Sequence, residues 1–537
     1  MHPRKEVTGS YQKITNSYID IDPIDIGDNS SFNTQGFSGS GTSADPFILE
    51  NRRITNKTEL SLIHIRNTNA YFIIRNNYLD GINKSPYGIY LYNVVNGVVE
   101  KNIIINTNRA IHFRSNSKDN LIINNTIHDN QYGITASSSY NNTYTCNKIF
   151  KNTKDGISFV EYPELQQGSR TLSGNTITNN LIEDNEGYHG IYIECGTHNL
   201  VINNVVKDNN ETGIDIVDGE QNTIYNNTVI GNKGAGIAIS NGFTDKFHLY
   251  ASSNITSNTI KQNHEGLVIF SWGDFRSKAG PNNVSKNIIV QNEFDSLYID
   301  SSNYTITENI ICANEDFGIE IESEGSDVIV KWNDFIGNLI GHDTQAIDGC
   351  GMNTDFNENY WDDWTYPDAN EDGIVDNPYP IFGGFDMSPL TTPQHELPID
   401  LHLLSRPRLL YPTGGEDLQG TITVKWTPVT DFSGHSVTYS LYYSPDEVDM
   451  AWEKLGTDLT NPTYEWDTTT VENDYNGLLK VVAKCSEGVT SEYVLYDPID
   501  IENPTAAPGW SFTMIVLTFC MGVIVTRAKK KRKKTLC

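Results

Sequence analysis

Residues 190–240 read GIYIECGTHNLVINNVVKDNNETGIDIVDGEQNTIYNNTVIGNKGAGIAIS, and this stretch decides the fold. Within it a Gly-Ile-x-Ile element recurs every 23 residues, at Gly190, Gly213 and Gly236. Each copy alternates inward and outward positions with period two, which is the pattern of a β-strand. The Asn-rich segments between copies are typical of turns, because Asn tolerates the left-handed backbone. A strand repeated at a fixed period predicts a solenoid in which each copy pairs with the next.

The repeat extends in both directions from this stretch. Related elements begin at Gly88, Ala110, Gly133, Gly156, Gly266, Ser296 and Gly318. Successive spacings are 22, 23, 23, 34, 23, 23, 30, 30 and 22 residues, so three coils carry insertions. About 22 residues accommodate three short strands and three turns, as in a parallel β-helix. A leucine-rich horseshoe has a similar period, but it needs dominant leucine and a helical return segment, and neither is seen.

The alternation also predicts which side chains point inward. We expect pairs of apolar residues to stack from coil to coil, namely Ile89 and Leu91, Ile191 and Ile193, Ile214 and Ile216, and Ile237 and Ile239.

Three features resemble the right-handed parallel β-helix repeats of the pectin-lyase-like superfamily, and most closely NosD-like archaeal surface proteins. They are GFSGSGTSADPFILENRRI from Gly36, the Asn-rich coils, and NYWDDWTYPDANEDGIVDNPYPI from Asn359. The resemblance implies an N-terminal segment and cap over 1–46 and a β-helix over 47–390. NosD proteins are copper-delivery accessories, but the 6 Met, 7 Cys and 12 His of this chain are scattered. Copper(I) sites need clusters of such residues, so this role is not expected to carry over.

A second unit follows a linker at 391–405. Residues 406–502 contain alternating strands, and VKW ending at Trp426, YSLYYSPDE and EWDTTTV resemble fibronectin type III domains of prokaryotic surface proteins. The sequence therefore predicts a β-sandwich that acts as a spacer. A short linker at 503–508 follows it.

Residues 509–526 form an uncharged run of 18 residues, long enough to cross a bilayer as a helix. The basic tail 527–537 follows at once, and positive residues stay cytoplasmic, which places the large acidic part outside the cell. The first 21 residues lack the apolar core of a secretory signal, so we expect an exported leader upstream.

The charge balance disfavours nucleic acid as a partner. Seven of the 38 basic residues lie in the last eleven positions, which leaves 31 basic against 68 acidic residues elsewhere. Such a surface repels phosphate backbones and suits cations or neutral glycans.

One acidic segment resembles an EF-hand calcium loop. Oxygen side chains stand at relative positions 1, 3, 5 and 9, from Asp368, Asn370, Asp372 and Asp376, and position 6 is Gly373. Position 7, Ile374, offers its carbonyl. Position 12 is Tyr379 instead of the usual Glu, which lowers the expected ligand number. The alternative is an acidic turn closed by its own hydrogen bonds.

The insertions predict a binding groove, because all three follow the same Gly-Ile strand. Beneath them we expect two outward rows, one with Ser158, Tyr192, Asp215, Ala238, Val268 and Tyr298, the other with Val160, Glu194, Val217, Ser240, Phe270 and Asp300. Aromatic faces beside carboxylates suit sugar rings. The predicted ligand-binding residues are Tyr192, Glu194, Asp215, Trp272 and Tyr298. An ordinary solvated strand face is the alternative.

Catalysis is the weaker prediction. Polysaccharide lyases on this fold need a basic residue beside calcium, and only Lys246, Arg276 and Lys278 lie near the groove. Glu194 and Asp215 are one coil and two residues apart, a spacing loosely compatible with an inverting acid–base pair. The sequence therefore favours recognition of an extracellular glycan, with a polysaccharide-degrading enzyme as the alternative.

Overall fold

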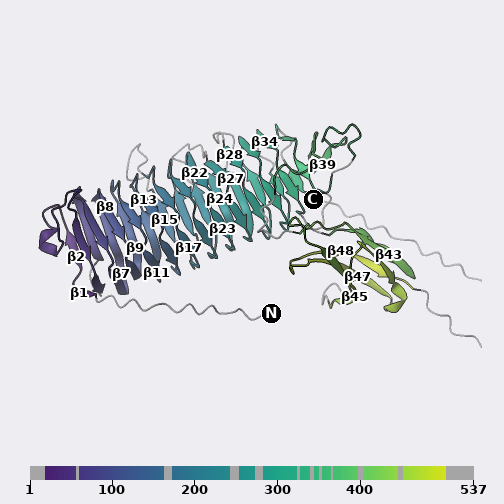
Figure 1. The fold of residues 1–537 in the computed structure, drawn as a ribbon, viewed down its shortest axis with the longest axis horizontal. Coiled ribbons are helices and arrows are strands. Elements are labelled where there is room, and N and C mark those ends of the chain that lie inside the picture. The colour runs from purple at the N-terminus through teal and green to yellow at the C-terminus, as the bar shows by residue number, and fades with distance from the viewer. Residues whose placement is uncertain are drawn as a thin grey trace, which may run out of the picture.

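The computed structural model describes twelve segments of the chain: 18–55, 60–161, 172–241, 253–271, 282–322, 327–338, 344–349, 353–364, 367–396, 404–405, 407–445 and 451–503. These segments are almost entirely β-structure, in a rod with a smaller unit beside one end (Figure 1). Short 3₁₀ turns occur at η1 (Asn33–Gln35) and η5 (Thr468–Thr470). Within the described segments no helix is long and apolar enough to span a membrane. The predicted helix at 509–526 lies outside them.

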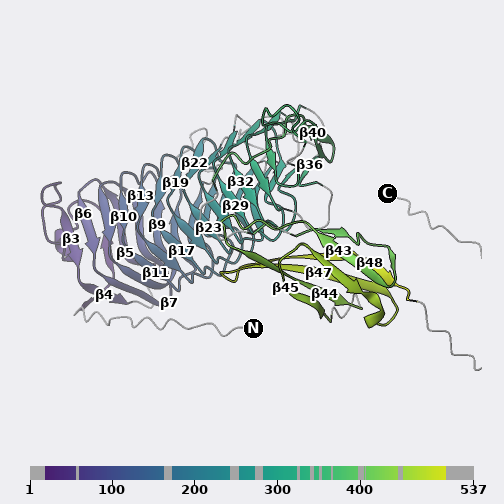
Figure 2. The ribbon, with the colours of Figure 1, turned by 45° about the vertical axis from the view of Figure 1, so that its right-hand side comes forward.

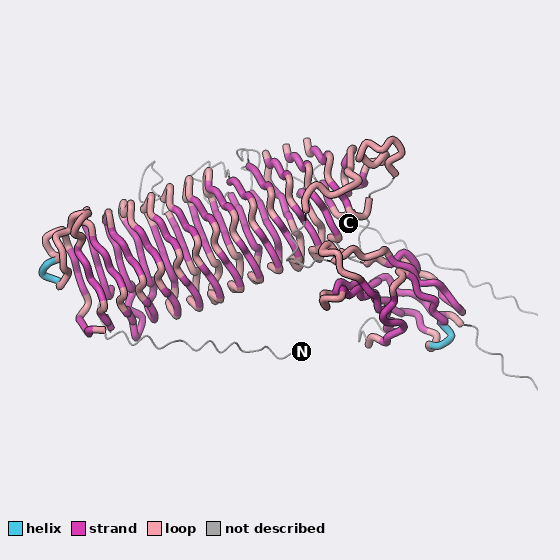
Figure 3. Tube along the Cα trace, viewed as in Figure 1, coloured by secondary structure: helices cyan, strands magenta, loops and turns pink. Residues whose placement is uncertain are grey.

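The rod is a parallel β-solenoid whose coils each contribute strands to three ladders (Figure 3). The first ladder is a 13-stranded sheet: β3 (Phe47–Glu50), β6 (Phe72–Arg75), β8 (Gly97–Glu100), β10 (Leu121–Ile123), β13 (Thr143–Thr145), β16 (Thr176–Thr178), β19 (Leu200–Ile202), β22 (Asn222–Tyr225), β25 (Ser253–Thr256), β28 (Asn282–Ser285), β31 (Tyr304–Thr307), β34 (Val328–Lys331) and β37 (Asp355–Asn357). The second comprises β1 (Ile19–Ile21), β4 (Arg52–Thr55), β7 (Tyr78–Val94), β9 (Ile103–Arg114), β11 (Thr126–His128), β14 (Lys148–Phe150), β17 (Leu181–Glu183), β20 (Val205–Lys207), β23 (Thr228–Ile230), β26 (Thr259–Lys261), β29 (Ile288–Val290), β32 (Ile310–Cys312), β35 (Asp334–Ile336) and β38 (Tyr360–Trp361).

The third ladder carries the Gly-Ile strands of the sequence repeat. It comprises β2 (Ile24–Ile26), β5 (Ser61–Thr68), the later parts of β7 and β9, β12 (Tyr132–Ala136), β15 (Ile157–Val160), β18 (Ile191–Glu194), β21 (Ile214–Val217), β24 (Ala235–Asn241), β27 (Glu265–Ser271), β30 (Leu297–Asp300), β33 (Ile319–Ile321) and β36 (Ala346–Asp348). All pairings within the three ladders are parallel, as the repeat predicts. The pairing starts with β1 and β2, so part of the predicted 1–46 cap already belongs to the first coil.

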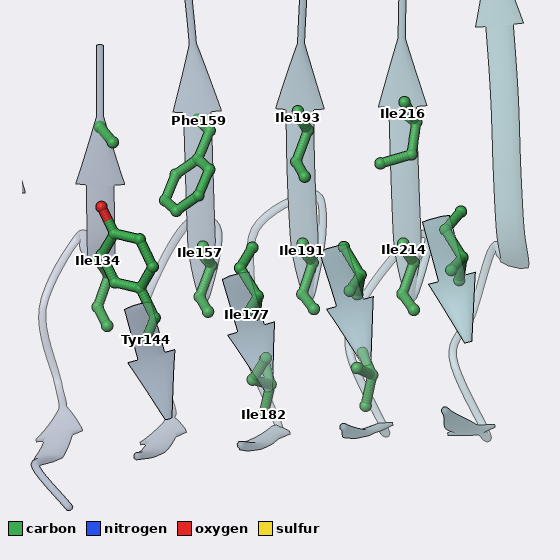
Figure 4. Packing of buried hydrophobic residues seen from close by; sticks show 14 of the residues in the cluster. Ile134, Tyr144, Ile157, Phe159, Ile177, Ile182, Ile191, Ile193, Ile214 and Ile216 are labelled. Carbon is green, nitrogen blue, oxygen red and sulfur yellow. The ribbon is translucent and has the colours of Figure 1, made fainter. Parts of the chain in front are cut away.

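Stacked aliphatic side chains fill the interior of the solenoid (Figure 4). Ile191 lies in register with Ile214, and Ile214 with Ile237, and all three are fully buried. Every residue predicted to point inward is at most 1% exposed. Burying such a side chain contributes about 1.5–3 kcal/mol, so the column of identical residues is the main source of stability.

Asparagines form continuous ladders at the corners of the coils, a feature that the sequence analysis did not predict. One ladder runs through Asn77, Asn102, Asn125, Asn147, Asn180, Asn204, Asn227, Asn258, Asn287, Asn309, Asn333 and Asn359. In each step the side-chain amide and the backbone N–H donate to the Oδ1 of the next asparagine; from Asn204 to Asn227 both bonds are 2.9–3.0 Å. The residue before each buried asparagine takes a positive φ, as Asn203 does at 56°.

The segment after the last coil covers the end of the rod. The hairpin β39 (Tyr379–Ile381) and β40 (Gly384–Asp386) stacks Tyr379 on Trp361 at 4.1 Å between ring centroids. Asp386 closes the asparagine ladder, because its carboxylate accepts from the backbone and side-chain amide of Asn359 and from the indole of Trp361. A carboxylate suits this place, since it accepts hydrogen bonds without needing a further acceptor beyond it.

The smaller unit contains two sheets that share one hydrophobic cluster. One sheet holds β41 (Leu409–Tyr411), β43 (Thr421–Trp426) and β46 (Thr463–Asp467); the other holds β42 (Asp417–Leu418), β48 (Thr490–Ile501), β47 (Asp474–Cys485), β44 (Val437–Ser444) and β45 (Glu453–Leu459). Figure 2 shows this unit alongside the last coils. Phe432 packs there against a solenoid cluster of Val290, Ile310, Cys312 and Ile336.

The cysteines differ in exposure. Cys195, Cys312 and Cys485 are buried thiols, whereas Cys146 is exposed. Cys350 lies outside the described residues.

Candidate functional site

The outward face of the third ladder carries the predicted groove residues. Strand registers align Tyr192 with Asp215 and Glu194 with Val217, one coil apart. The same registers continue both rows, from Ser158 to Tyr298 and from Val160 to Asp300. The rows therefore lie side by side along the rod, as the period predicts. Trp272 and the basic residues Lys246, Arg276 and Lys278 lie outside the described residues.

His189 lies at the centre of this face, between two carboxylates. Its Nδ1 is 3.3 Å from Asp155 Oδ1, and its Nε2 is 3.2 Å from Asp215 Oδ2. The imidazole also stacks on Tyr192, with ring centroids 4.8 Å apart. Both carboxylates are mostly buried, with side chains 8% and 15% exposed. Two buried acids on either side of one ring require a positive charge between them.

The surroundings of His189 keep it protonated. Burial alone would lower its pKa, but hydrogen bonds from the ring to Asp155 and Asp215, together with their charges, outweigh burial and raise the pKa to about 9. At neutral pH the ring is therefore an imidazolium that donates from both nitrogens.

Tyr192 and Glu194 form the other half of the cluster. The Tyr192 hydroxyl donates to Glu194 Oε2 at 3.1 Å. Burial raises the pKa of Glu194, as do the charges of Asp218 and Asp215, and these effects exceed the opposing hydrogen bond from Tyr192. Burial and the neighbouring Glu194 and Asp215 likewise raise the pKa of Tyr192. Glu194 can thus hold a proton more readily than an exposed carboxyl, a property of general acids and of groups that hydrogen-bond sugar hydroxyls.

A shallow pocket of about 450 Å³ opens beside this cluster. It is lined by His189, Tyr192, Glu194 and Asp215 and, further along the same rows, by Val268 and Phe270. The pocket thus offers polar groups at one end and apolar atoms at the other, about two coils or roughly 10 Å apart along the rod.

A second pocket, of about 380 Å³, lies further toward the N-terminus on the same face. Tyr87, Arg109, Arg114 and Tyr132 line it. The Arg109 guanidinium lies 5.9 Å from the ring centre of Tyr87 and 5.3 Å from that of Tyr132. Among the described residues, neither arginine forms an ion pair with a carboxylate. Two arginines without a carboxylate partner in the described segments are unusual on a chain with 38 basic and 68 acidic residues. Their planar guanidinium groups can bind a carboxylate or a sulfate through paired hydrogen bonds.

His112 lies in the same pocket but is neutral. Burial and the neighbouring charges of Arg109 and Arg114 lower its pKa to about 3. Its Nδ1 is 2.8 Å from the Thr135 hydroxyl. The outward face thus has two parts. The cationic part contains Arg109, Arg114 and the neutral His112, and the acidic part contains Asp155, Asp215 and the protonated His189.

Sequence reasoning found Tyr192, Glu194 and Asp215 but missed His189. Strict alternation inward from Ile191 would turn His189 toward the core. Instead, the N–H groups of Gly190 and Ile191 both donate to the following coil, to Thr212 and Gly213. Two successive donors on one side break the alternation as a bulge does and turn His189 outward. The sequence signal that could have identified His189 is its position directly before the repeated glycine, Gly190, where the strand alternation begins.

The acidic loop at 368–376 is closed by its own hydrogen bonds. Asp368 accepts from the backbone N–H groups of Asp372 and Gly373, and Asp376 accepts from that of Ala369. Tyr379, at position 12, is buried, and its hydroxyl accepts from the backbone of Gln345. It therefore supplies no ligand to the loop. Side-chain oxygens of Asp368, Asn370, Asp372 and Asp376 remain as potential calcium ligands.

The comparisons with known proteins concern the fold. Residues 7–166 and 165–247 match the family described as the right handed beta helix region. This match and the parallel solenoid support the superfamily that the sequence resembles. The NosD-like and fibronectin type III resemblances stay predictions. No curated protein matches the chain.

Similar solved structures are distant. The A-module of a mannuronan C-5 epimerase from Azotobacter vinelandii is 14% identical, with coverage of 62% of this chain and 93% of that one and a TM-score of 0.38. The catalytic unit of an α-1,3-glucanase from Streptomyces thermodiastaticus is 13% identical, with coverage of 63% and 69% and a TM-score of 0.42. The Dettilon tailspike protein is 10% identical, with coverage of 85% and 86% and a TM-score of 0.35. These values describe a shared β-helix and carry no functional argument.

Proposed function

We propose that this protein is a cell-surface β-helix protein that binds an extracellular glycan along the outward face of the third ladder. The observation that supports this most is the cluster of His189, Tyr192 and Glu194 at the wall of a shallow, partly apolar pocket. Aromatic faces pack on sugar C–H groups, while fixed donors and acceptors select hydroxyl positions. Tyr298 lies in the same row one coil beyond Val268 and extends the binding face.

The cationic pocket supports a ligand that carries acid groups. Arg109 and Arg114 would bind a carboxylate or sulfate on one sugar, while the acidic part of the face would accept hydroxyl donors from others. A glycan with both kinds of residue, laid along the rod, satisfies both pockets.

A panel of neutral, uronic-acid and sulfated oligosaccharides, read for both binding and product release, tests this proposal. Binding without product is expected, and Tyr192→Ala should weaken it at least ten-fold. Arg109→Met should weaken only the acidic ligands, with Lys118→Met, a lysine over the Tyr140 ring that does not line the pocket, as the matched control. No binding to any member of the panel would count against the proposal.

A second candidate is a polysaccharide hydrolase or lyase that uses the same pocket. It is favoured by the raised pKa of Glu194 near Asp215, whose carboxylate already bonds the His189 imidazolium. An acid and a separate base are the minimum for hydrolysis of a glycosidic bond. Product formation that is abolished by Glu194→Gln or Asp215→Asn would establish this function and overturn binding without catalysis.

The parts of the chain outside the pockets also have proposed roles. Calcium at the 368–376 loop would stabilise the end of the solenoid, and no copper role is proposed. The unit at 406–502 would serve as a fibronectin type III-like spacer. A helix at 509–526 would anchor the protein in the cell membrane as a single pass, with the large part outside and the tail 527–537 in the cytoplasm.

A further inference from the structure

Three potential metal ligands converge in the smaller unit, far from the glycan face. Ligand atoms of Asp431, His435 and Cys485 all lie within 4.8 Å of one another. No other group of three or more His, Cys, Asp or Glu residues converges in this way among the residues that the structure describes. The three come from two elements, the loop before β44 and the last residue of β47.

The loop holds one oxygen of Asp431 and leaves the other turned toward the histidine. Its Oδ1 accepts from the backbone N–H of Ser433 at 2.7 Å. Its Oδ2 lies 3.3 Å from Nδ1 of His435. Tetrahedral zinc with bonds of about 2.0–2.2 Å to nitrogen and oxygen separates such ligands by about 3.3–3.5 Å. The pair therefore already has the spacing of one edge of a zinc tetrahedron.

Burial distinguishes this group from an ordinary surface cluster. The Asp431 side chain is 1% exposed and that of His435 is 29% exposed. Cys485 is also buried. The backbone N–H groups of Ser433 and His435 and the Cys485 thiol donate hydrogen bonds to the Asp431 carboxylate. A carboxylate, a thiol and an imidazole thus face one point that solvent reaches from the histidine side.

We propose that Asp431, His435 and Cys485 bind one zinc ion, with water as the fourth ligand. Mixed O, N and S donors that converge within 4.8 Å suit zinc better than calcium or magnesium, which take oxygen ligands. Binding replaces the Cys485 S–H bond with a zinc–thiolate bond, and the thiol proton leaves to solvent.

The position of the ion gives it a structural role. Asp431 and His435 belong to the loop that carries Phe432 into the solenoid cluster of Ile310 and Ile336. Cys485 pairs with Val437 in the adjoining sheet. Zinc would therefore fix the Phe432 loop to the sheet and hold the smaller unit in one orientation against the last coils.

Cobalt titration of the full-length chain, purified with a chelator, tests the site. Co²⁺ should give a thiolate-to-cobalt charge-transfer band with one ion per chain, and Zn²⁺ should displace it. Cys485→Ser should abolish the band, and His435→Gln, at a partly exposed position, should weaken cobalt binding at least ten-fold. Hydrogen exchange should also slow in the loop around Gly434 when zinc is added.

Matched thiol variants separate this site from adventitious binding. Cys146→Ser removes an exposed thiol and Cys312→Ser a buried one, and both should keep the band. The proposal is overturned if the wild-type chain gives no band at millimolar Co²⁺, if the band survives Cys485→Ser, or if His435→Gln binds cobalt as tightly as the wild type.

Discussion

His189 links the electrostatics of the proposed binding face to the stability of the fold. A histidine with a pKa raised to about 9 binds its proton more tightly in the folded than in the unfolded chain. Its contribution is fully present below about pH 6.5, the ordinary pKa, and is lost as pH rises toward 9. The difference between the two pKa values corresponds to at most about 3 kcal/mol.

We therefore predict that His189→Gln destabilises the protein most at pH 6 and progressively less up to pH 9.5. Urea unfolding at several pH values measures this difference. His198→Gln, which alters an exposed histidine, is the control. Equal pH dependence in the wild type and His189→Gln would show that the Asp155 and Asp215 pairs do not set the charge of the ring.

The site could be predicted from the sequence only where strand periodicity holds. Tyr192, Glu194 and Asp215 follow the alternation from Ile191 and Ile214, so their outward positions were readable. His189 was not, because the paired N–H donors at Gly190 and Ile191 depend on the coil that follows. Arg109, in the cationic pocket, was likewise not recognised, because it lies directly before the repeat element that begins at Ala110 and outside the positions to which the alternation was applied.

Among the elements, the asparagine ladder makes the sharpest prediction for the solenoid. Asn204 accepts from Asn180 and donates to Asn227, and it is almost fully buried. Asn204→Ala would leave the backbone and side-chain amides of Asn180 without that acceptor, at about 1–3 kcal/mol for each orphaned group. We expect thermal unfolding to show a loss of about 3 kcal/mol or more.

Asn203→Ala provides a matched control one residue away. Asn203 is exposed and left-handed, and its Oδ1 accepts one exposed hydrogen bond from the Asn226 side chain at 2.7 Å. Its replacement should therefore cost only about 1–2 kcal/mol, from the backbone conformation and that single bond. Similar losses for the two variants would mean that the turn conformation, and not the internal ladder, stabilises the corner.

The Asn-rich composition predicted turns, but it did not predict that neighbouring asparagines have two different structural roles. In a pair such as Asn203–Asn204 the first residue makes the turn and the second enters the ladder. Sequence alone treats the two as equivalent, because the same residue type serves both roles. The coil period and the inward rows were predictable, since they depend on spacing alone.

At the end of the rod, calcium should order the acidic loop. We predict that calcium raises the melting temperature and shifts tryptophan emission, because Trp361 and Trp364 pack beside Tyr379 near the loop. A hundredfold excess over the dissociation constant would add about 2.7 kcal/mol. Asp372→Ala should remove both effects, while Glu371→Ala, at a non-ligand position, should not. If calorimetry shows no heat of binding at millimolar calcium, the loop is only an acidic turn closed by its own hydrogen bonds.

At the scale of the whole molecule, we predict that the C-terminal segment attaches the protein to a membrane. Deleting residues 509–537 should move the protein from the membrane fraction to the soluble fraction, because the only long uncharged apolar run would be gone. Alkaline carbonate extraction measures this. Replacing the lysines of 527–537 alone should leave the protein in the membrane. Recovery of the intact chain in the soluble fraction would contradict the anchor.

The parallel ladders also determine how the rod would respond to mechanical tension. The hydrogen bonds between coils run along the rod axis, so a pull on its two ends loads them in series, one coil at a time. Each coil that peels away would release about 22 residues, or roughly 70 Å of extended chain. Stretched between the proposed membrane anchor and a captured polymer, the molecule would lengthen one coil at a time, with longer steps at the three coils that carry insertions, and would dissipate force gradually.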